Sequence, residues 1–341
     1  QLRELYLKPF AAAIKEGGAL AVMPAYSELD GIPIHSSKFL LTDILRNELG
    51  FGGITIADYG AIQMLYSTHN IAKNLQQAGE LAVKAGMDFE AGAISCYGEK
   101  LIELVKKGVV SQKIINTAVS RILRIKFLAG IMDNPYGNKE NVKKYYKCEK
   151  HKKIALEAAR ESIVLLKNKN NILPLNKNIK SIAIIGPNAD RGELGDYSLP
   201  NEDVVTPIQG IKNILPSSCQ INYAKGCGLW ELDKGGFDEA VNAAKNSEAA
   251  IVVVGETSIK GYGIGWGRET DDVILCGEGY DRSDLSLPGV QQQLVEEILK
   301  TGTPTILVLI NGRPTTLGRI NENIYAIIEA WYPGQEGGNA I

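Results

Sequence analysis

The apolar residues of the first 130 positions alternate between helical and strand spacing. Residues 1–15 carry apolar side chains on one helical face, and this stretch ends at Gly17 and Gly18. Further on, short β-branched and apolar runs predict buried strands, and longer amphipathic stretches between them predict helices. The expected strands are residues 19–26, 53–58 and 87–90, and the expected further helices are residues 38–48, 75–84, 100–107 and 111–127. Strands that alternate with helices in this way indicate βα units and a parallel sheet.

Residues 129–150 interrupt this alternation. They hold an Asn-Pro pair and a glycine within a charged, tyrosine-rich tract, which is typical of a linker. Beyond it, the pattern predicts a helix over residues 153–166 and then a second set of βα units. The expected strands of that set are residues 181–185, 250–255, 305–310 and 325–331, and its expected helices are residues 237–245 and 290–300. We therefore predict an α/β domain at residues 1–130, a linker at residues 131–152 and a second α/β domain at residues 153–341.

The composition narrows the classes of protein that the chain can represent. It has 341 residues, a formal net charge of -2 and 45% hydrophobic residues, which are ordinary values for a globular protein of about two domains. The near-neutral charge argues against a nucleic-acid partner, because such a partner requires a concentrated basic surface. No apolar run reaches the roughly 20 residues that span a bilayer, so the sequence predicts no membrane partner.

The five cysteines are scattered along the chain, at positions 96, 148, 219, 227 and 276. Their odd number and the lack of CxxC or Cys/His spacing predict neither a disulfide framework nor a metal site. Unpaired thiols favour a cytoplasmic protein. Because the chain opens at Gln1 within a helical pattern, a preceding targeting segment keeps secretion as the alternative.

Polar residues stand where the predicted strands of the first domain end. Tyr26, Asp58 and Glu90 occupy these positions, and the strand ends of parallel α/β folds face the ligand site. Asp58, followed by Tyr59 and Gly60, would present its carboxylate at the mouth of the sheet. The structural alternative is that Asp58 caps the helix that follows. Glu90 is interpreted as a residue that stabilises its strand end.

A second acidic candidate lies in the second domain. Glu278 stands between Gly277 and Gly279, on a loop before a predicted helix. A flexible loop of this kind can carry a carboxylic acid into a cleft. The structural alternative is a surface turn in which the neighbouring charges of Asp281 and Arg282 are solvated.

Other residues rank behind these two acids. Glu256, directly after a predicted strand, is a rival acid. The glycine-rich residues 261–267 superficially resemble a phosphate-binding loop but lack the strand–GxGxxG–helix context of a dinucleotide site. Trp266 within them could instead stack on a sugar at the outer rim of a site. The three histidines have no metal-ligand spacing, and His35 is interpreted as structural.

Several stretches resemble family 3 glycoside hydrolases in sequence, order and spacing. They are residues 23–33 (MPAYSELDGIP), 38–46 (KFLLTDILR), 51–60 (FGGITIADYG), 162–168 (SIVLLKN), 173–175 (LPL), 185–189 (IGPNA), 277–289 (GEGYDRSDLSLPG) and 331–338 (WYPGQEGG). Any one of these stretches could arise by chance. The ordered set is specific, and it extends over essentially the whole chain.

The resemblance implies a fold and a site. Residues 1–130 would be the C-terminal part of a (β/α)8-type barrel, and residues 153–341 an open α/β sandwich with a mostly parallel, six-stranded sheet that is incomplete at its C-terminus. The active site of the family lies between two such domains. The family's nucleophile maps onto Asp58 and its general acid/base onto Glu278.

Four further residues are candidates for contact with the sugar. The resemblance places Met23 and Tyr26 near the sugar-binding subsite. Tyr59 stands where many relatives have tryptophan, which makes it a candidate for stacking on the sugar. Trp266 is the candidate at the rim.

The activity that the resemblance implies is that of a retaining, exo-acting β-glycosidase. It would hydrolyse terminal β-D-glucosyl residues of a β-linked oligosaccharide or an aryl glycoside by double displacement, without a metal or cofactor. The nearest alternative is a β-xylosidase of the same family, and a glycoside phosphorylase is a third. A non-catalytic carbohydrate-binding relative would have no need of the acid pair Asp58 and Glu278. A nucleotide-binding protein has no support in the sequence.

The chain also departs from the family pattern. Sugar-binding residues of the family barrel, including an Asp, an Arg and a Lys-His pair, belong to strands that would precede Gln1. Three strands cannot close an eight-stranded barrel. We therefore expect an internal segment of a longer protein that is inactive alone, with the rest of the barrel in the same protein, in another chain or in a partner subunit. A homo-oligomer is compatible with the sequence.

Overall fold

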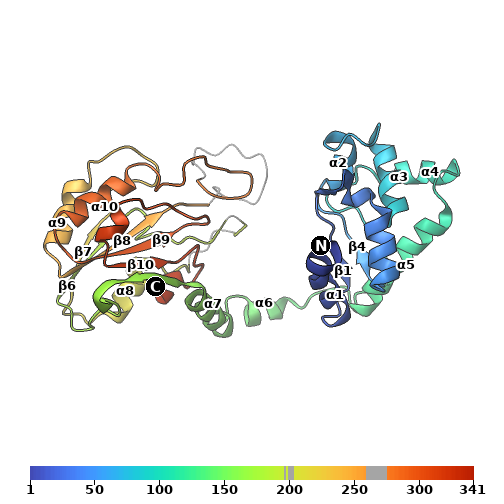
Figure 1. Ribbon diagram of the computed structural model, residues 1–341. Coiled ribbons are helices and arrows are strands. Elements are labelled where there is room, and N and C mark those ends of the chain that lie inside the picture. The colour runs from blue at the N-terminus through green and yellow to red at the C-terminus, as the bar shows by residue number, and fades with distance from the viewer. Residues whose placement is uncertain (196, 199–202, 259–274) are drawn as a thin grey trace. The chain divides into compact units, whose positions relative to one another are not determined.

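The computed structural model describes residues 1–195, 197–198, 203–258 and 275–341 (Figure 1). These residues form two compact units, Gln1–Lys139 and Glu140–Ile341. Each unit has an apolar core of its own. No helix within the described ranges is long and apolar enough to cross a membrane.

The first unit packs helices around a short parallel pair of strands. β1 (Ala21–Val22) pairs with β4 (Ile54–Thr55), and Ile56 adds one parallel bridge to Phe89. The three strands predicted for this unit thus lie beside one another in the expected parallel sense. Regular pairing covers only a part of each predicted strand.

The other elements of the first unit are one hairpin and a series of helices. The hairpin pairs β2 (Glu28–Leu29) with β3 (Ile32–Pro33). The helical elements are η1 (Leu2–Tyr6), α1 (Leu7–Lys15), η2 (Ile34–Ser36), η3 (Phe39–Glu48), α2 (Ala61–Ser67), α3 (Leu75–Ala85), α4 (Glu99–Lys106) and α5 (Gln112–Leu128). α6 (Lys139–Tyr145) crosses the boundary between the units. Every helix predicted for this unit is present, whereas α2 was not predicted.

The helix α3 shows how local sequence sets this packing. Asn74 caps its first turn, with its side-chain oxygen accepting from the backbone N–H of Gln77 at 2.9 Å, and Gly86 ends it at a φ of 118°. Its buried face carries small residues, Ala78, Gly79, Ala82 and Ala85. A Cβ on Gly79 would lie 2.4 Å from the carbonyl oxygen of Cys96. The small face therefore lets the following loop cross directly over the helix.

A buried ion-pair cluster joins the strands of this unit to its helices. The carboxylate of Asp88 accepts from Arg46 at 2.7 Å, from Arg121 at 2.9 Å and from the backbone N–H of Thr55 at 3.0 Å. The Asp88 side chain is 1% exposed. A buried carboxylate needs such partners, because an unpaired one would be costly to bury. The cluster ties η3 and α5 to the end of β4.

The second unit is built on a six-stranded sheet in the order β5-β10-β9-β8-β6-β7. The strands are β5 (Val164–Asn168), β6 (Ser181–Ile185), β7 (Gln220–Ala224), β8 (Ala249–Gly255), β9 (Thr305–Ile310) and β10 (Ala326–Glu329). All neighbouring pairs are parallel except β5 with β10, which is antiparallel. The predicted α/β class with a mostly parallel sheet is confirmed for this unit.

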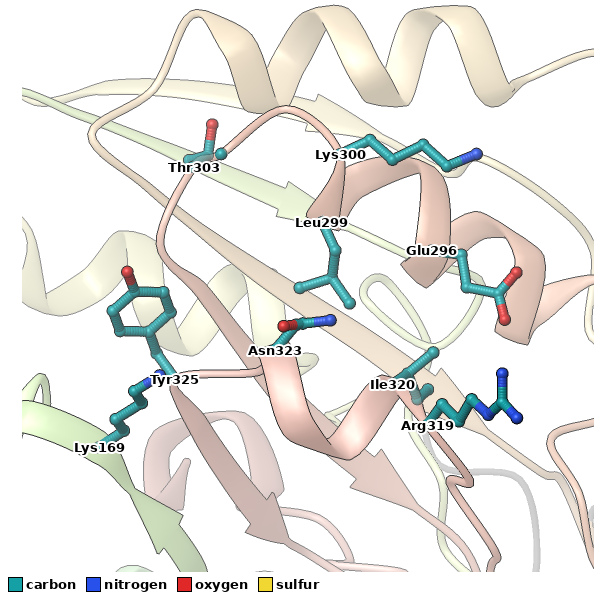
Figure 2. Close-up of a pocket in the computed structure, with 10 residues that line it drawn as sticks. Lys169, Glu296, Leu299, Lys300, Thr303, Arg319, Ile320, Asn323 and Tyr325 are labelled. Atoms are coloured by element: carbon teal, nitrogen blue, oxygen red, sulfur yellow. The ribbon is translucent and has the colours of Figure 1, made fainter.

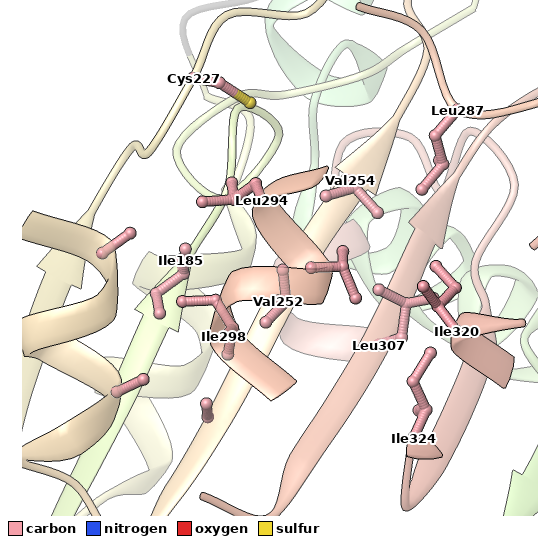
Figure 3. Packing of buried hydrophobic residues seen from close by; sticks show 14 of the residues in the cluster. Ile185, Cys227, Val252, Val254, Leu287, Leu294, Ile298, Leu307, Ile320 and Ile324 are labelled. Atoms are coloured by element: carbon pink, nitrogen blue, oxygen red, sulfur yellow. The ribbon is translucent and has the colours of Figure 1, made fainter. Parts of the chain in front are cut away.

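Helices cover both faces of this sheet. They are α7 (Glu149–Ser162), η4 (Lys169–Asn171), α8 (Pro207–Ile214), α9 (Phe237–Lys245), α10 (Gln291–Leu299), α11 (Ile320–Asn323) and α12 (Gly337–Ala340). On one face, Leu294 and Ile298 of α10 lie over Val252 of β8 and Leu307 of β9 (Figure 3). On the other face, α8 packs on the sheet with α12 beside it. Because both faces are covered, every residue of β8 and β9 is buried, which explains their uninterrupted apolar sequences.

One predicted boundary of this unit is wrong. The helix expected over residues 153–166 ends at Ser162, and Val164–Asn168 form the strand β5. Ile163 already has extended backbone angles, φ -68° and ψ 133°. The β-branched and leucine-rich run that follows pairs with β10 at the edge of the sheet. The strand β7 and the helix α8 were not predicted.

Candidate active site

Asp58 lies at the point where the chain leaves the parallel strands of the first unit. The two residues before it are still hydrogen-bonded to neighbouring strands, Ile56 to Val22 at 3.0 Å and Ala57 to Phe89 at 2.9 Å. Gly60, with a φ of 73°, then turns the chain into α2. The sequence explains why the strand ends here: the apolar run stops at the charged Asp58, and Gly60 adopts the positive φ of the turn.

The structural alternative for Asp58, a helix cap, does not describe the geometry. The N-cap position of α2 is Gly60, and no side chain caps that helix. The carboxylate of Asp58 instead accepts from the backbone N–H of Tyr59 at 2.7 Å, before the helix begins. Its side chain is half-buried. The carboxylate therefore has no cap bond to α2.

Tyr26 and Tyr59, both predicted to contact the sugar, are brought together with Asp58. The hydroxyl of Tyr26 donates to the carbonyl oxygen of Tyr59 at 2.8 Å. The ring of Tyr59 is 73% exposed and lies beside Gly92, where a Cβ would be 3.0 Å from Cδ1 of the ring. Met23 is exposed as well. The end of the first strand is thus tied to the segment that carries Asp58.

His69 is a residue of this site that the sequence did not indicate. Its Nε2 lies 3.0 Å from the carbonyl oxygen of Tyr26, and its Nδ1 lies 3.6 Å from a carboxylate oxygen of Glu28. The imidazole therefore links the loop after α2 to the backbone of Tyr26. Histidine has no strong pattern of its own, and its partners are more than 40 positions away. No signal in the sequence could have found it.

His35 is almost completely buried, at 2% exposure. Burial lowers the pKa of His35 to about 4, whereas the negative charge of Asp58 acts in the opposite direction and a charge on His69 would lower it further. The imidazole is thus neutral at neutral pH. This burial fits the structural role expected of His35.

The buried His35 predicts a loss of stability in mild acid. Its pKa is lower in the folded state than in the unfolded state, so between these two values the unfolded chain binds more protons. Stability then falls as the pH decreases, by about 2 kcal/mol between pH 7 and pH 5 from this group. Urea unfolding at both pH values should show a smaller loss for His35→Gln than for the unchanged protein. The exposed His151, changed in the same way, is the control, and equal losses in all three proteins would contradict the prediction.

Glu278 lies at the tip of a tight turn in the second unit. Gly277 and Tyr280 form an antiparallel bridge, with the N–H of Tyr280 donating to the carbonyl oxygen of Gly277 at 3.1 Å. Gly277 and Gly279 have φ values of 149° and 79°, which explains the glycines on both sides of the acid. Glu278 is exposed, and its Oε2 accepts from the hydroxyl of Tyr197. Trp266, the candidate at the rim, lies outside the described residues.

The rival acid Glu256 is buried and paired with two arginines. It is 1% exposed, and its two carboxylate oxygens face Arg282 and Arg313. Arg282 is correspondingly not a solvated surface charge, since its side chain is 20% exposed. The carboxylate of Glu90 also has partners within the protein, since it accepts from the backbone N–H groups of Ser95, Cys96 and Tyr97.

A cavity of about 530 Å³ in the second unit lies away from these acids. Figure 2 shows Thr303 and Tyr325, which lie one or two residues before β9 and β10, among the residues that line it. It thus opens at the amino ends of these strands. Glu256 follows the carboxyl end of β8, and β8 runs parallel to β9, so Glu256 lies at the opposite end of these strands. Among the described residues, no group of three or more His, Cys, Asp or Glu side chains could hold a metal ion.

Comparison with known proteins matches both parts of the chain. A family model described as the glycosyl hydrolase family 3 N-terminal domain matches residues 1–125, and one described as the glycosyl hydrolase family 3 C-terminal domain matches residues 163–341. A β-xylosidase of Formosa agariphila is 41% identical over 100% of this chain and 47% of its own length. A periplasmic β-glucosidase of Salmonella typhimurium is 36% identical over 98% of this chain and 45% of its own length.

Solved structures give the same result. A β-glucosidase from Listeria innocua in complex with isofagomine has a TM-score of 0.88 and 30% sequence identity, with 100% of this chain and 45% of that chain covered. The chain therefore spans about half the length of the curated relatives it matches.

Proposed function

Since the chain belongs to glycosyl hydrolase family 3, we propose that it supplies both catalytic carboxyl groups of a retaining, exo-acting β-glycosidase that releases terminal β-D-glucosyl residues. Asp58 is the nucleophile and Glu278 the general acid/base. The observation that carries the proposal is the position of Asp58, whose carboxylate stands at the end of the parallel strands and has no cap bond to α2. Residues 1–130 contribute barrel structure, residues 131–152 link it to the second domain, and residues 153–341 form the sandwich domain.

The reaction proceeds in two displacements. A carboxylate oxygen of Asp58 bonds to the anomeric carbon while the glycosidic C–O bond breaks, and Glu278 gives its proton to the departing oxygen. Glu278, now a carboxylate, takes a proton from water as the water oxygen attacks the anomeric carbon. The bond between Asp58 and the anomeric carbon breaks as the new C–O bond forms, so Asp58 leaves as a carboxylate and Glu278 is protonated again. Such a pair operates with carboxyl groups roughly 5–5.5 Å apart and without a metal or cofactor.

The aromatic residues near Asp58 bind the sugar. The exposed ring of Tyr59 offers a face for stacking, and the bond from Tyr26 to the carbonyl oxygen of Tyr59 fixes the backbone that carries it. Met23 is assigned to the same sugar-binding subsite, and Trp266 is assigned a stacking role at the outer rim. Substrates are β-linked oligosaccharides or aryl glycosides.

A β-xylosidase is the second candidate function. It is favoured by the relative with 41% identity, which bears that name. A pocket that accepts xylose in preference to glucose needs only a group that blocks the C6 hydroxymethyl.

One experiment tests the reaction and its substrate together. The full-length protein is assayed on matched aryl β-glucoside and aryl β-xyloside, and the anomer released first is identified by NMR. We expect the β anomer, with a value of kcat/KM that is at least about tenfold higher for the glucoside. Preference for the xyloside selects the second candidate, and turnover that requires phosphate indicates a phosphorylase. An α anomer as the first product contradicts double displacement, and sugar binding without turnover indicates a non-catalytic relative.

A further inference from the structure

A buried carboxylate is connected through arginines to the turn that carries Glu278. Glu256 follows the last residue of β8 and is 1% exposed. Its backbone is fixed on both sides: its N–H donates to the carbonyl oxygen of Ile310 at 2.7 Å, and its carbonyl oxygen accepts from Asn188 at 3.1 Å. The Glu256 side chain therefore projects from a rigid point of the sheet.

Two arginines from different segments meet this carboxylate. Arg282, four positions beyond Glu278, contacts Oε1 of Glu256. Arg313, just after β9, has its Nε 3.6 Å from Oε2. The side chains of Arg282 and Arg313 are 20% and 17% exposed, so water screens these pairs only in part. Removing the carboxylate would leave two partly buried positive charges facing each other.

Arg313 holds the backbone of the turn itself, and Arg282 holds the segment that follows it. Arg313 donates from Nη2 to the carbonyl oxygen of Tyr280 at 2.6 Å, and Arg282 donates from Nη2 to the carbonyl oxygen of Ser286 at 2.9 Å. Tyr280 is the residue that closes the turn onto Gly277, and Glu278 lies within it. A continuous set of contacts thus runs from β8 through Glu256 and the arginines to the turn.

An acid on a glycine-flanked turn needs such support. The two glycines give the backbone around Glu278 a wide range of accessible conformations. Proton transfer to a departing oxygen, in contrast, requires the acid within hydrogen-bonding reach of that oxygen. Misplacement by about 1 Å can cost two orders of magnitude in rate.

We propose that Glu256 is a positioning residue, which orients the general acid/base Glu278 through Arg282 and Arg313. This inference rests on the role proposed for Glu278. Glu256 itself touches no substrate. Its negative charge holds Arg313, which bonds to the turn at Tyr280, and Arg282, which bonds to the following segment at Ser286.

The test compares two leaving groups on the same sugar. In the full-length protein with Glu256→Gln, kcat/KM for a phenyl glycoside is expected to fall about 10- to 100-fold, because departure of phenol needs protonation. For a dinitrophenyl glycoside, whose leaving group needs no proton, the fall should stay below about threefold. The amplitude of the pre-steady-state burst counts the active sites in each sample. Glu296→Gln, a matched change at the cavity of Figure 2, should alter neither rate.

A double variant separates positioning from a merely structural role. In the Glu278→Ala background, adding Glu256→Gln should change the rate on the phenyl glycoside by less than about twofold, because the acid that Glu256 orients is already gone. Equal losses on both leaving groups, or a full additional loss in the double variant, would overturn the proposal. An unchanged Glu256→Gln protein would overturn it as well.

Arg282→Lys gives an independent reading if Glu256→Gln does not fold. A single ammonium group keeps the charge but cannot reach both Glu256 and Ser286 as the guanidinium does. The loss should again be confined to the phenyl glycoside. If Glu278→Ala itself shows no dependence on the leaving group, the proposed function fails, whatever Glu256 does.

Discussion

Replacing Asp58 by alanine is expected to reduce hydrolysis of an aryl β-glucoside by the full-length protein by roughly 10⁴-fold or more. The physical reason is the loss of the atom that attacks the anomeric carbon. The two acids nearest the same strand ends already have partners, because Glu90 accepts from three backbone N–H groups and Asp88 is paired with two arginines. The initial rates of the variant and the unchanged protein measure the effect.

An assay with added azide shows whether Asp58→Ala is inactive because it lacks the nucleophile or because it is misfolded. The shortened side chain leaves room on the α face of the sugar, and a small anion can attack from there. Added azide should therefore restore turnover of Asp58→Ala and give the α-glycosyl azide. The exposed Asp133, changed to alanine, is the matched control and should keep the full rate. Full activity of Asp58→Ala would show that the assignment of this residue is wrong.

The sequence predicts the layers of the fold well where strands are buried on both faces. β8 and β9 are continuous apolar runs, and both were found at nearly the predicted positions. The strands β5 and β7 were not predicted, and the two errors have a common cause. Five residues after α7 fit either a helical face or an edge strand, and only their pairing with β10, more than 150 positions away, decides between the two. β7 is likewise an edge strand, with polar residues in it.

For the candidate site, the sequence indicates the acids but not their partners. Asp58 and Glu278 stand out because glycines and strand ends mark their positions. The contact from Glu256 to Arg282 joins residues 26 positions apart. The Arg282 side chain is largely buried only because the fold brings these two residues together. A charge in a loop is usually solvated, so a sequence offers no reason to expect this pair. Long-range contacts of single side chains leave no periodic pattern.

The second large effect is expected for Glu278→Ala, and its signature differs from that of Asp58→Ala. With a phenyl glycoside, the first displacement lacks its acid, and the rate should fall by about 10²–10⁴-fold. With a dinitrophenyl glycoside, the first displacement needs no acid, so a burst of dinitrophenol should appear. Turnover should then stall, because no base activates water for the second displacement. Stopped-flow absorbance measures the burst and the steady rate separately.

Azide again identifies the missing group, through the configuration of its product. The glycosyl group bound to Asp58 exposes the β face of its anomeric carbon, and an anion that attacks there needs no general base. Azide should therefore relieve the stall of Glu278→Ala and give the β-glycosyl azide, the opposite anomer to the product of Asp58→Ala. Glu248→Ala, in the same unit but before β8, should show neither the stall nor the azide effect. Hydrolysis of the phenyl glycoside at an unchanged rate would place the acid elsewhere, and the buried, doubly paired Glu256 could not supply it without moving.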